Sequence, residues 1–201
     1  MKIPSKYIEN AVDQIASLPG IGKRTALRLV LQLLSRSKEE IEDFSNSFTL
    51  MKENVKHCST CGNVTDMEVC GICRNPGRDK SIICVVEDIR DILAIEATET
   101  YKGVYHVLGG IISPMDGIGP NDLNITSLIN RSSTGSVKEI IFALSATMEG
   151  DTTNFFLYRK LKGFNIPIST LSRGVSIGSE LQYADEITLS RSLLNRQPFE
   201  V

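Results

Sequence analysis

The sequence lacks the long apolar runs of a membrane protein and the leader of a secreted one. No stretch approaches the roughly 18 consecutive apolar residues that a membrane-spanning helix needs. The first ten residues carry charges but no apolar core, which is not the pattern of a secretory signal. The sequence also contains no internal repeat and no low-complexity segment. We therefore expect a globular protein of the cytoplasm, built as one domain or as a few small ones.

Disulfide bonds are not expected either, although the sequence contains five cysteines. Disulfides persist in oxidising compartments, and nothing in this sequence indicates secretion. Four of the cysteines form two CxxC pairs, whereas Cys84 lies inside the apolar run 82–86. We expect Cys84 to be a small buried hydrophobic residue.

The charges are nearly balanced, with a net charge of −2, but the basic residues are unevenly distributed. Between Leu18 and Lys38 there are five Lys or Arg residues and no Asp or Glu, whereas residues 81–201 are mildly acidic. A local basic stripe on a mildly acidic chain indicates an anionic partner at one end only. A solvated helix face gives the same pattern, so charge alone does not decide between the two.

The first quarter of the chain is predicted to be helical. Apolar residues at helical spacing predict one helix over 5–17 and a second from Lys23 to about Ser35. Residues 37–40 (SKEE) have the form of a capping box and open a third helix. This third helix carries an apolar stripe formed by Ile41, Phe44, Phe48, Met51 and Val55.

From residue 80 onward, short apolar runs alternate with helical segments. The runs predict four strands, at 81–86, 103–108, 139–144 and 166–170. Helices are predicted after each of them, at 89–95, 121–131, 151–162 and 183–194. Strands that alternate with helices in this way indicate a parallel α/β sheet.

Four cysteines share the spacing of a zinc site: Cys58, Cys61, Cys70 and Cys73. Thiolates suit Zn²⁺, and each CxxC pair can bind it from a single turn. Gly62 and Gly71 each follow a cysteine at a position where a positive φ is often needed. The eight residues between the pairs contain little apolar material, so this module should need the metal in order to fold. Redox use of the CxxC pairs is the main alternative.

A catalytic role for the zinc is not expected, because four thiolates leave no open coordination position for water. His57 adjoins Cys58, but the four cysteines already complete a tetrahedron. We therefore expect His57 at the surface or beside the site and not as a ligand.

Residues 18–26 (LPGIGKRTA) join the first two predicted helices and resemble the helix-hairpin-helix motif, which binds the DNA backbone without reading bases. Gly20 and Gly22 permit a tight turn whose amides face outward at the start of the second helix, and such amides bind phosphate well. Lys23, Arg24 and Arg28 add positive charge nearby. Contacts of this kind are sequence-independent and weaken with salt.

This turn has two other interpretations. It could pack the helices together without binding any ligand. It could also be a nucleotide-binding loop, but a Walker A pattern needs Gly where Ser17 stands and Ser or Thr where Arg24 stands.

Acidic residues follow two of the predicted strands. Glu87 and Asp88 come after the first strand, and Glu149 and Asp151 come after the third. Parallel strands place these positions at the carboxyl edge of the sheet, where α/β proteins build their sites. The pattern resembles the Toprim domain of topoisomerases and primases, in which the acids hold Mg²⁺ for phosphoryl transfer.

The sequence departs from the Toprim pattern because Glu149 stands where that family usually has Asp. It also has no assignable tyrosine nucleophile, and Asp151 is predicted to cap the helix that follows. We expect the acidic edge to contact partner proteins. Mg²⁺ is possible at this edge but is not expected.

The order of these modules resembles the bacterial RecR family of recombination mediators, over nearly the whole chain. The matching segments are 18–22, the four cysteines, 86–87, 144–153, 172–174 and 183–186. Segment 183–186 falls in the region that is called Walker B-like in members of this family. The sequence departs from the family between 172 and 182, where Pro and two adjacent glycines are usual.

This resemblance implies a protein of recombinational DNA repair that is not an enzyme. Family members assemble into a ring that can encircle DNA, and they act with RecO and RecF. Together these proteins load the recombinase RecA onto single-stranded DNA that is coated by its binding protein. For this chain, the resemblance implies sequence-independent DNA binding, a homo-oligomer (a dimer or a ring tetramer), and a place at the nucleoid.

Two other functions are compatible with parts of the sequence. The first is a Mg²⁺-dependent Toprim nuclease or primase-like enzyme that uses Glu87, Glu149 and Asp151. The second is a nucleotide-binding regulator, which the incomplete Walker A pattern disfavours.

The predicted fold is an α+β protein of several modules with one structural zinc ion per chain. Residues 1–56 are expected to form the helical helix-hairpin-helix domain, and residues 57–77 the four-cysteine zinc finger. Residues 78–173 are expected to form an α/β Toprim domain with a parallel sheet. Residues 174–201 should form the Walker B-like segment, with a short helix and a tail.

Overall fold

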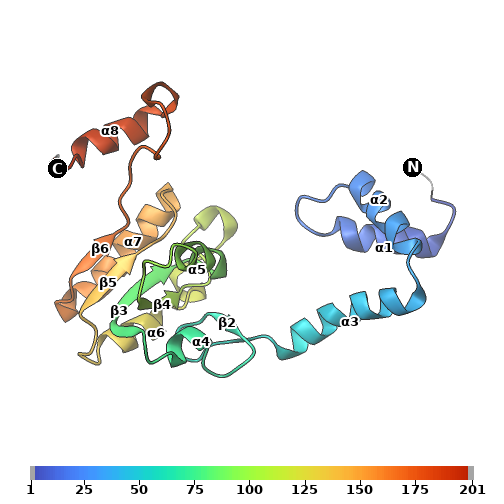
Figure 1. Cartoon of the computed structure of the whole chain (residues 1–201), viewed down its shortest axis with the longest axis horizontal. Helices are drawn as coiled ribbons and strands as arrows, with labels where there is room; N and C mark the ends of the chain where they lie inside the picture. Colours follow the sequence, from blue (N-terminus) through green and yellow to red (C-terminus); the bar gives the residue numbers. More distant parts are fainter. Residues whose placement is uncertain (1–2, 199–201) are drawn as a thin grey trace. The chain divides into compact units, whose positions relative to one another are not determined.

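The computed structural model describes residues 3–198 and divides into two compact units (Figure 1). Unit 1 covers Met1–Val55 and unit 2 covers Lys56–Val201. Residues 1–2 and 199–201, at the ends of the first and last predicted domains, lie outside the described residues. Among the described residues, no helix is both long enough and apolar enough to span a bilayer.

Unit 1 begins with two helices that pack against each other, α1 (Lys6–Ala16) and α2 (Lys23–Leu34). Their contact is a small core in which Val12, Ala26 and Val30 are buried. These residues lie on the apolar faces that the sequence predicts, so both helices and the break between them are confirmed.

Helix α3 (Lys38–Asn54) completes unit 1 and begins with the predicted capping box. The Ser37 hydroxyl accepts from the Glu40 amide at 3.2 Å, and the Glu40 carboxylate accepts from the Ser37 amide at 2.9 Å. None of the α3 residues is buried, however. Its apolar stripe lies largely exposed along one helix face, with Phe44 and Phe48 in an edge-to-face contact at 5.1 Å between ring centroids.

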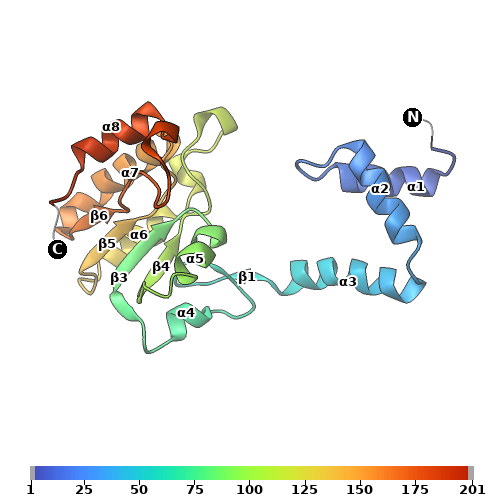
Figure 2. The ribbon, with the colours of Figure 1, turned by 45° about the horizontal axis from the view of Figure 1, so that its top comes forward.

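Unit 2 is built on a four-stranded sheet with the order β4-β3-β5-β6, and all of its strands are parallel (Figure 2). The strands are β3 (Asp79–Val86), β4 (Gly103–Val107), β5 (Glu139–Phe142) and β6 (Ile168–Thr170). Helices α5 (Ile89–Glu96), α6 (Ile125–Ser132) and α7 (Met148–Leu161) connect them. The predicted parallel α/β sheet and its four strands are therefore confirmed, as is the multi-module α+β fold.

The two faces of the sheet carry separate hydrophobic clusters, as the alternation of side chains along a strand requires. One face places Ile83 and Val85 of β3 against buried residues of α6 and α7, such as Leu128 and Leu157. The opposite face places Cys84 with Tyr105 of β4 and Ile92 of α5. Cys84 is a buried residue of this second cluster, as predicted, and not part of the metal site.

Three helix starts differ from the predicted ones. Helix α7 begins at Met148, because the Thr147 hydroxyl caps it by accepting from the Gly150 amide at 3.1 Å. The prediction that Asp151 caps this helix is therefore wrong. Helix α6 begins later than predicted because residues 120–122 form a separate 3₁₀ turn, η2 (Pro120–Asp122). Helix α8 (Glu186–Leu194) likewise begins after η4 (Leu181–Tyr183).

The cysteine segment is a small module at the start of unit 2. It contains a two-stranded antiparallel ribbon, β1 (Lys56–His57) with β2 (Val64–Thr65), and one short helix, α4 (Gly71–Arg74). The module docks on the edge strand β4, where the Val107 amide donates to the Cys61 carbonyl at 2.7 Å. Two further 3₁₀ turns, η1 (Pro114–Asp116) and η3 (Lys162–Phe164), lie in the connections of the sheet.

Candidate metal centre and nucleic-acid interface

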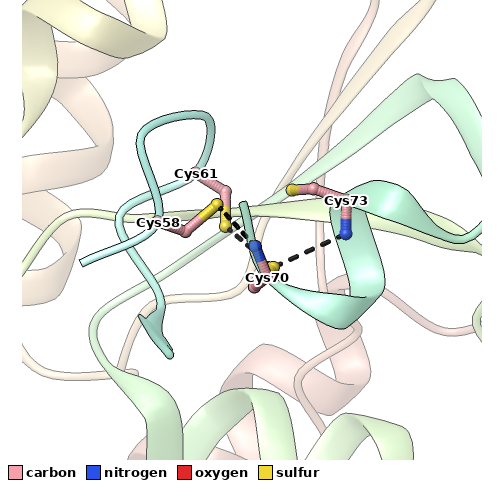
Figure 3. A group of neighbouring side chains, drawn as sticks. All are labelled: Cys58, Cys61, Cys70 and Cys73. Atoms are coloured by element: carbon pink, nitrogen blue, oxygen red, sulfur yellow. Dashed lines mark hydrogen bonds between the residues drawn. The ribbon is translucent and has the colours of Figure 1, made fainter. Parts of the chain in front are cut away.

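The four predicted cysteine ligands come together in one buried cluster (Figure 3). Their sulfur atoms all lie within 4.8 Å of one another, and the sulfurs of Cys61 and Cys70 are 3.7 Å apart. A zinc ion with Zn–S bonds of about 2.3 Å sets neighbouring sulfurs roughly 3.8 Å apart in a tetrahedron. The donor set and the spacing therefore both fit Zn²⁺ held by four thiolates.

Backbone amides favour ionised sulfur in this cluster. The Cys70 amide donates to the Cys58 sulfur at 3.2 Å, and the Cys73 amide donates to the Cys70 sulfur at 3.5 Å. Burial raises the pKa of the Cys58 thiol, but backbone N–H groups of Cys70, Cys61 and Thr60 outweigh burial and bring it to about 6.

The opposite holds for Cys61, where a hydrogen bond with Cys73, together with burial, raises the pKa of the thiol. Without a metal, Cys58 therefore favours the thiolate form and Cys61 the thiol form. A bound cation would stabilise all four sulfurs as thiolates at once.

The two glycines of the knuckles have different roles. Gly62 has a φ of 78°, and an added Cβ would meet the Asn124 side-chain nitrogen at 2.7 Å and the Val107 carbonyl oxygen of β4 at 3.0 Å. Gly71 does not have a positive φ, so that prediction is wrong: it is the first residue of α4, and the preceding Cys70 is the N-cap. His57 is exposed, with its Nδ1 3.1 Å from the Gly62 carbonyl oxygen.

A half-buried arginine next to this module was not identified from the sequence. Arg131 of α6 donates to the Tyr105 carbonyl at 2.8 Å and lies 3.3 Å from Nδ1 of the buried His106. Burial lowers the pKa of Arg131, and the nearby Cys73 acts in the opposite direction. The Arg131 guanidinium therefore places a positive charge close to the four cysteine sulfurs. Nothing in the sequence singles it out, because a basic residue in the last turn of a helix is ordinary.

The turn between α1 and α2 exposes the start of α2. Gly20 has a φ of 79°, which favours glycine, and Gly22 is the N-cap residue. Gly22 offers no side chain to satisfy the first-turn amides of α2, so these amides remain for water or a ligand. A Cβ added at either glycine would meet no atom within 4 Å, so the surface around the turn is open.

The three predicted basic residues at this turn are exposed but not equivalent. Lys23 reaches across to α1 and pairs with Asp13 at 3.0 Å, and that hydrogen bond raises the pKa of the lysine. Arg24 and Arg28 form no ion pair within residues 3–198. Both arginines are exposed one turn apart on α2, so they share a helix face.

The first pair of predicted acids follows β3. Glu87 is half-buried, and burial, together with the nearby Asp91 and Asp88, raises the pKa of its carboxyl. Asp88 caps α5 by accepting from the Arg90 amide at 2.7 Å, and it also pairs with the Arg90 side chain. The Arg90 contact lowers the pKa of Asp88. Asp88 thus has a structural task at the start of α5.

The second pair lies in the first turn of α7. Glu149 is exposed, whereas Asp151 is bound by two arginines, Arg173 and Arg191, which the sequence did not reveal. The four acids do not gather into a metal site. In the described part of the chain, the four cysteines are the one group of three or more Cys, His, Asp or Glu side chains close enough together to hold a metal ion.

In the Walker B-like segment, Asp185 has a structural role at the start of α8. Asp185 caps α8 through its carboxylate, which accepts from the Thr188 amide at 2.9 Å, and this contact lowers the pKa of Asp185. Tyr183, two residues before it, is exposed.

Protein-family comparisons match four consecutive parts of this chain. Residues 8–51 match the helix-hairpin-helix of RecR, and residues 55–75 match its four-cysteine zinc finger domain. Residues 81–172 match the Toprim domain, and residues 174–197 match the C-terminal part of RecR. The hairpin, the cysteine cluster and the sheet thus each correspond to a described module.

Curated relatives match over the full length of the chain. The chain is 58% identical over 200 residues to recombination protein RecR of Parabacteroides distasonis, covering 100% of this chain and 96% of that protein. It is 58% identical to the protein of the same name from Flavobacterium johnsoniae, covering 100% and 97%. The Bacteroides thetaiotaomicron protein of that name is 57% identical over 98% of this chain and 96% of its own length. The chain therefore belongs to the RecR family of recombination proteins.

Proposed function

We propose that this protein is a non-catalytic, DNA-binding mediator of recombinational repair. It forms an oligomeric clamp and acts with RecO and RecF to load RecA onto single-stranded DNA. The observation that carries this proposal is the hairpin turn of unit 1, where uncapped amides and two exposed arginines face solvent together.

The hairpin has the chemistry of a phosphate-backbone contact. Gly22 leaves the positive end of the α2 dipole open, and Arg24 and Arg28 extend the positive charge along the helix. The open amides at the start of α2 suit phosphate oxygens, which are the same at every base sequence. Binding should therefore be sequence-independent and should weaken steeply with salt.

Oligomerisation gives such a weak contact its use, because linked copies bind one DNA molecule with a combined affinity. Unit 1 exposes several large apolar side chains, namely Leu18, Leu34, Phe44, Phe48 and Met51. Grooves of about 520 and 490 Å³ run beside α3. These features support a homo-oligomer, which we propose to be a dimer or a ring tetramer.

The remaining parts have supporting roles in this proposal. One zinc ion per chain holds the cysteine module on β4, and Mg²⁺ has no required role. The exposed Glu149 offers a negative charge for contact with a partner protein, which we propose to be RecO or RecF. A protein that binds chromosomal DNA acts at the nucleoid, so we propose that location in the cytoplasm.

DNA binding is tested by fluorescence anisotropy of labelled duplex and single-stranded DNA, with variants that alter the turn and leave the fold intact. Gly22→Ala places a methyl group in open space at an ordinary φ, so it should preserve unit 1 and yet block the approach of a phosphate. Gly163→Ala, also in open space but in unit 2, is the matched control. Loss of binding in the first variant alone supports the proposal, and equal binding in both contradicts it.

The mediator role is tested by measuring DNA binding and particle mass together, with and without RecO. The proposal predicts a particle larger than one chain and a joint complex with RecO and DNA. Incubation of labelled DNA with Mg²⁺ or Mn²⁺ should produce neither cleavage nor synthesis. A metal-dependent product, lost when Glu149 and Asp151 are replaced, would contradict the non-catalytic role.

A further inference from the structure

The C-terminal segment of unit 2 returns to the carboxyl edge of the sheet and binds one of its acids. Arg173 lies just after β6, and Arg191 lies on α8. Both side chains reach Asp151 in the first turn of α7, across separations of 22 and 40 residues. Two arginines that are distant from each other in the sequence therefore converge on a single carboxylate.

This contact uses both oxygen atoms of the carboxylate. Arg173 is bidentate, with Nη2 2.5 Å from Oδ1 and Nη1 3.1 Å from Oδ2. Arg191 adds a third bond, from Nη2 to Oδ2 at 3.3 Å. The Arg173 side chain is 25% exposed and the Asp151 side chain 41% exposed, so water screens this pair in part, and the bidentate geometry contributes most to its strength. The Arg173 contact also lowers the pKa of Asp151, which keeps the carboxylate ionised.

Apolar packing, by contrast, attaches α8 only weakly to the rest of unit 2. None of its residues is buried; Leu189 is half-buried, and Ile187, Leu193 and Leu194 are exposed. Within the described residues, α8 itself is tied to Asp151 by Arg191, and Arg173 ties the segment that leads to α8 to the same carboxylate.

We propose that Asp151 and the two arginines form a latch that holds the C-terminal segment on the sheet, and that this latch excludes divalent cations from the acid. Asp151 occupies the position of an acid that would bind a metal ion at the carboxyl edge of such a sheet. The guanidinium groups of Arg173 and Arg191 stand where that metal ion would bind. They donate hydrogen bonds to both oxygens of the Asp151 carboxylate and place two positive charges beside it. A divalent cation would have to break three hydrogen bonds and approach against that charge.

The latch lies wholly in unit 2 and does not involve the hairpin, so it can hold or fail independently of DNA binding. It is tested by hydrogen exchange of the α8 backbone amides in the full zinc-loaded chain. Asp151→Asn should raise exchange in α8 by roughly tenfold or more, which corresponds to the loss of one charge-assisted hydrogen bond. Glu149→Gln removes a neighbouring carboxylate that forms no ion pair within residues 3–198, and it should leave exchange unchanged.

Arg173→Gln tests the latch from its other side, which guards against a fold defect specific to the Asp151 variant. The double variant should exchange little faster than Asp151→Asn alone, because Asp151→Asn already removes the ion pair with Arg173. Additive effects, or an unchanged α8 in Asp151→Asn, would overturn the latch.

Manganese provides the second arm of the test on the wild-type chain. If the latch excludes cations, millimolar Mn²⁺ leaves α8 exchange as it was. If Asp151 is instead a metal ligand, Mn²⁺ displaces the arginines and raises exchange in α8, which would overturn the proposal.

Discussion

Replacing one zinc ligand should separate the cysteine module from the sheet, whereas replacing the fifth cysteine should not. Cys61→Ala is the sharpest perturbation, because Cys61 contributes both a buried thiol to the cluster and the carbonyl that accepts from Val107 of β4. Cys84→Ala is the matched control, since Cys84 is also buried but belongs to the sheet core.

The two substitutions should differ strongly in magnitude. Binding of a structural zinc ion is worth about 10–16 kcal/mol of apparent free energy in small zinc modules. A whole domain is stable by only about 5–15 kcal/mol, so losing a ligand should unfold the cysteine module. The same loss should expose the outer edge of β4. Cys84→Ala removes one buried sulfur and should cost about 1–2 kcal/mol.

Zinc content by elemental analysis and urea unfolding of each purified variant measure both effects. We expect one zinc ion per chain in the wild type and in Cys84→Ala, and none in Cys61→Ala. Protein purified without chelators that contains no zinc would refute this reasoning. A Cys61→Ala chain that retains one zinc ion and its unfolding free energy would refute it as well.

Three further predictions concern unit 2. Gly150→Ala should destabilise the chain by more than about 2 kcal/mol in urea unfolding, because its Cβ would lie 2.0 Å from a backbone oxygen, whereas Gly163→Ala should be nearly neutral. Burial lowers the pKa of His106 to about 4, so the unfolded state takes up its proton first. Stability should fall by up to about 3 kcal/mol from pH 6.5 to pH 4, and His106→Gln should flatten this part of the pH curve. Glu149→Ala combined with Asp151→Asn should leave DNA affinity unchanged in an anisotropy titration.

Local patterns in the sequence were sufficient for the four strands of the sheet and for the metal cluster, but not for the exact helix starts. The strands are continuous apolar runs because both faces of a parallel sheet are buried, as the two clusters around Ile83 and Cys84 show. The cysteines could be assigned because ligand spacing within a turn is a local property. Thr147 and Asp151 are both good capping residues, so propensity alone could not choose the start of α7.

The ion pairs could not be predicted, because they join residues that only the fold brings together. Asp13 meets Lys23 across the hairpin, and Arg173 and Arg191 meet Asp151 across much of unit 2. These contacts change the interpretation of the sites. Lys23, the basic residue nearest the turn, already pairs with Asp13. Asp151 already pairs with the two arginines.

The role of the hairpin is tested most directly by the salt dependence of DNA binding in the variant Arg24→Ala with Arg28→Ala. Each lost phosphate contact lowers the slope of log K against log salt by about 0.9, so the double variant should lose roughly 2 per engaged hairpin. Near 0.15 M salt, the same loss corresponds to roughly 30-fold weaker binding. Lys102→Ala with Lys162→Ala removes equal charge from exposed positions of unit 2 and should change neither quantity. If the arginine variant keeps the wild-type affinity and slope, with its zinc content and particle mass intact, the DNA site lies elsewhere.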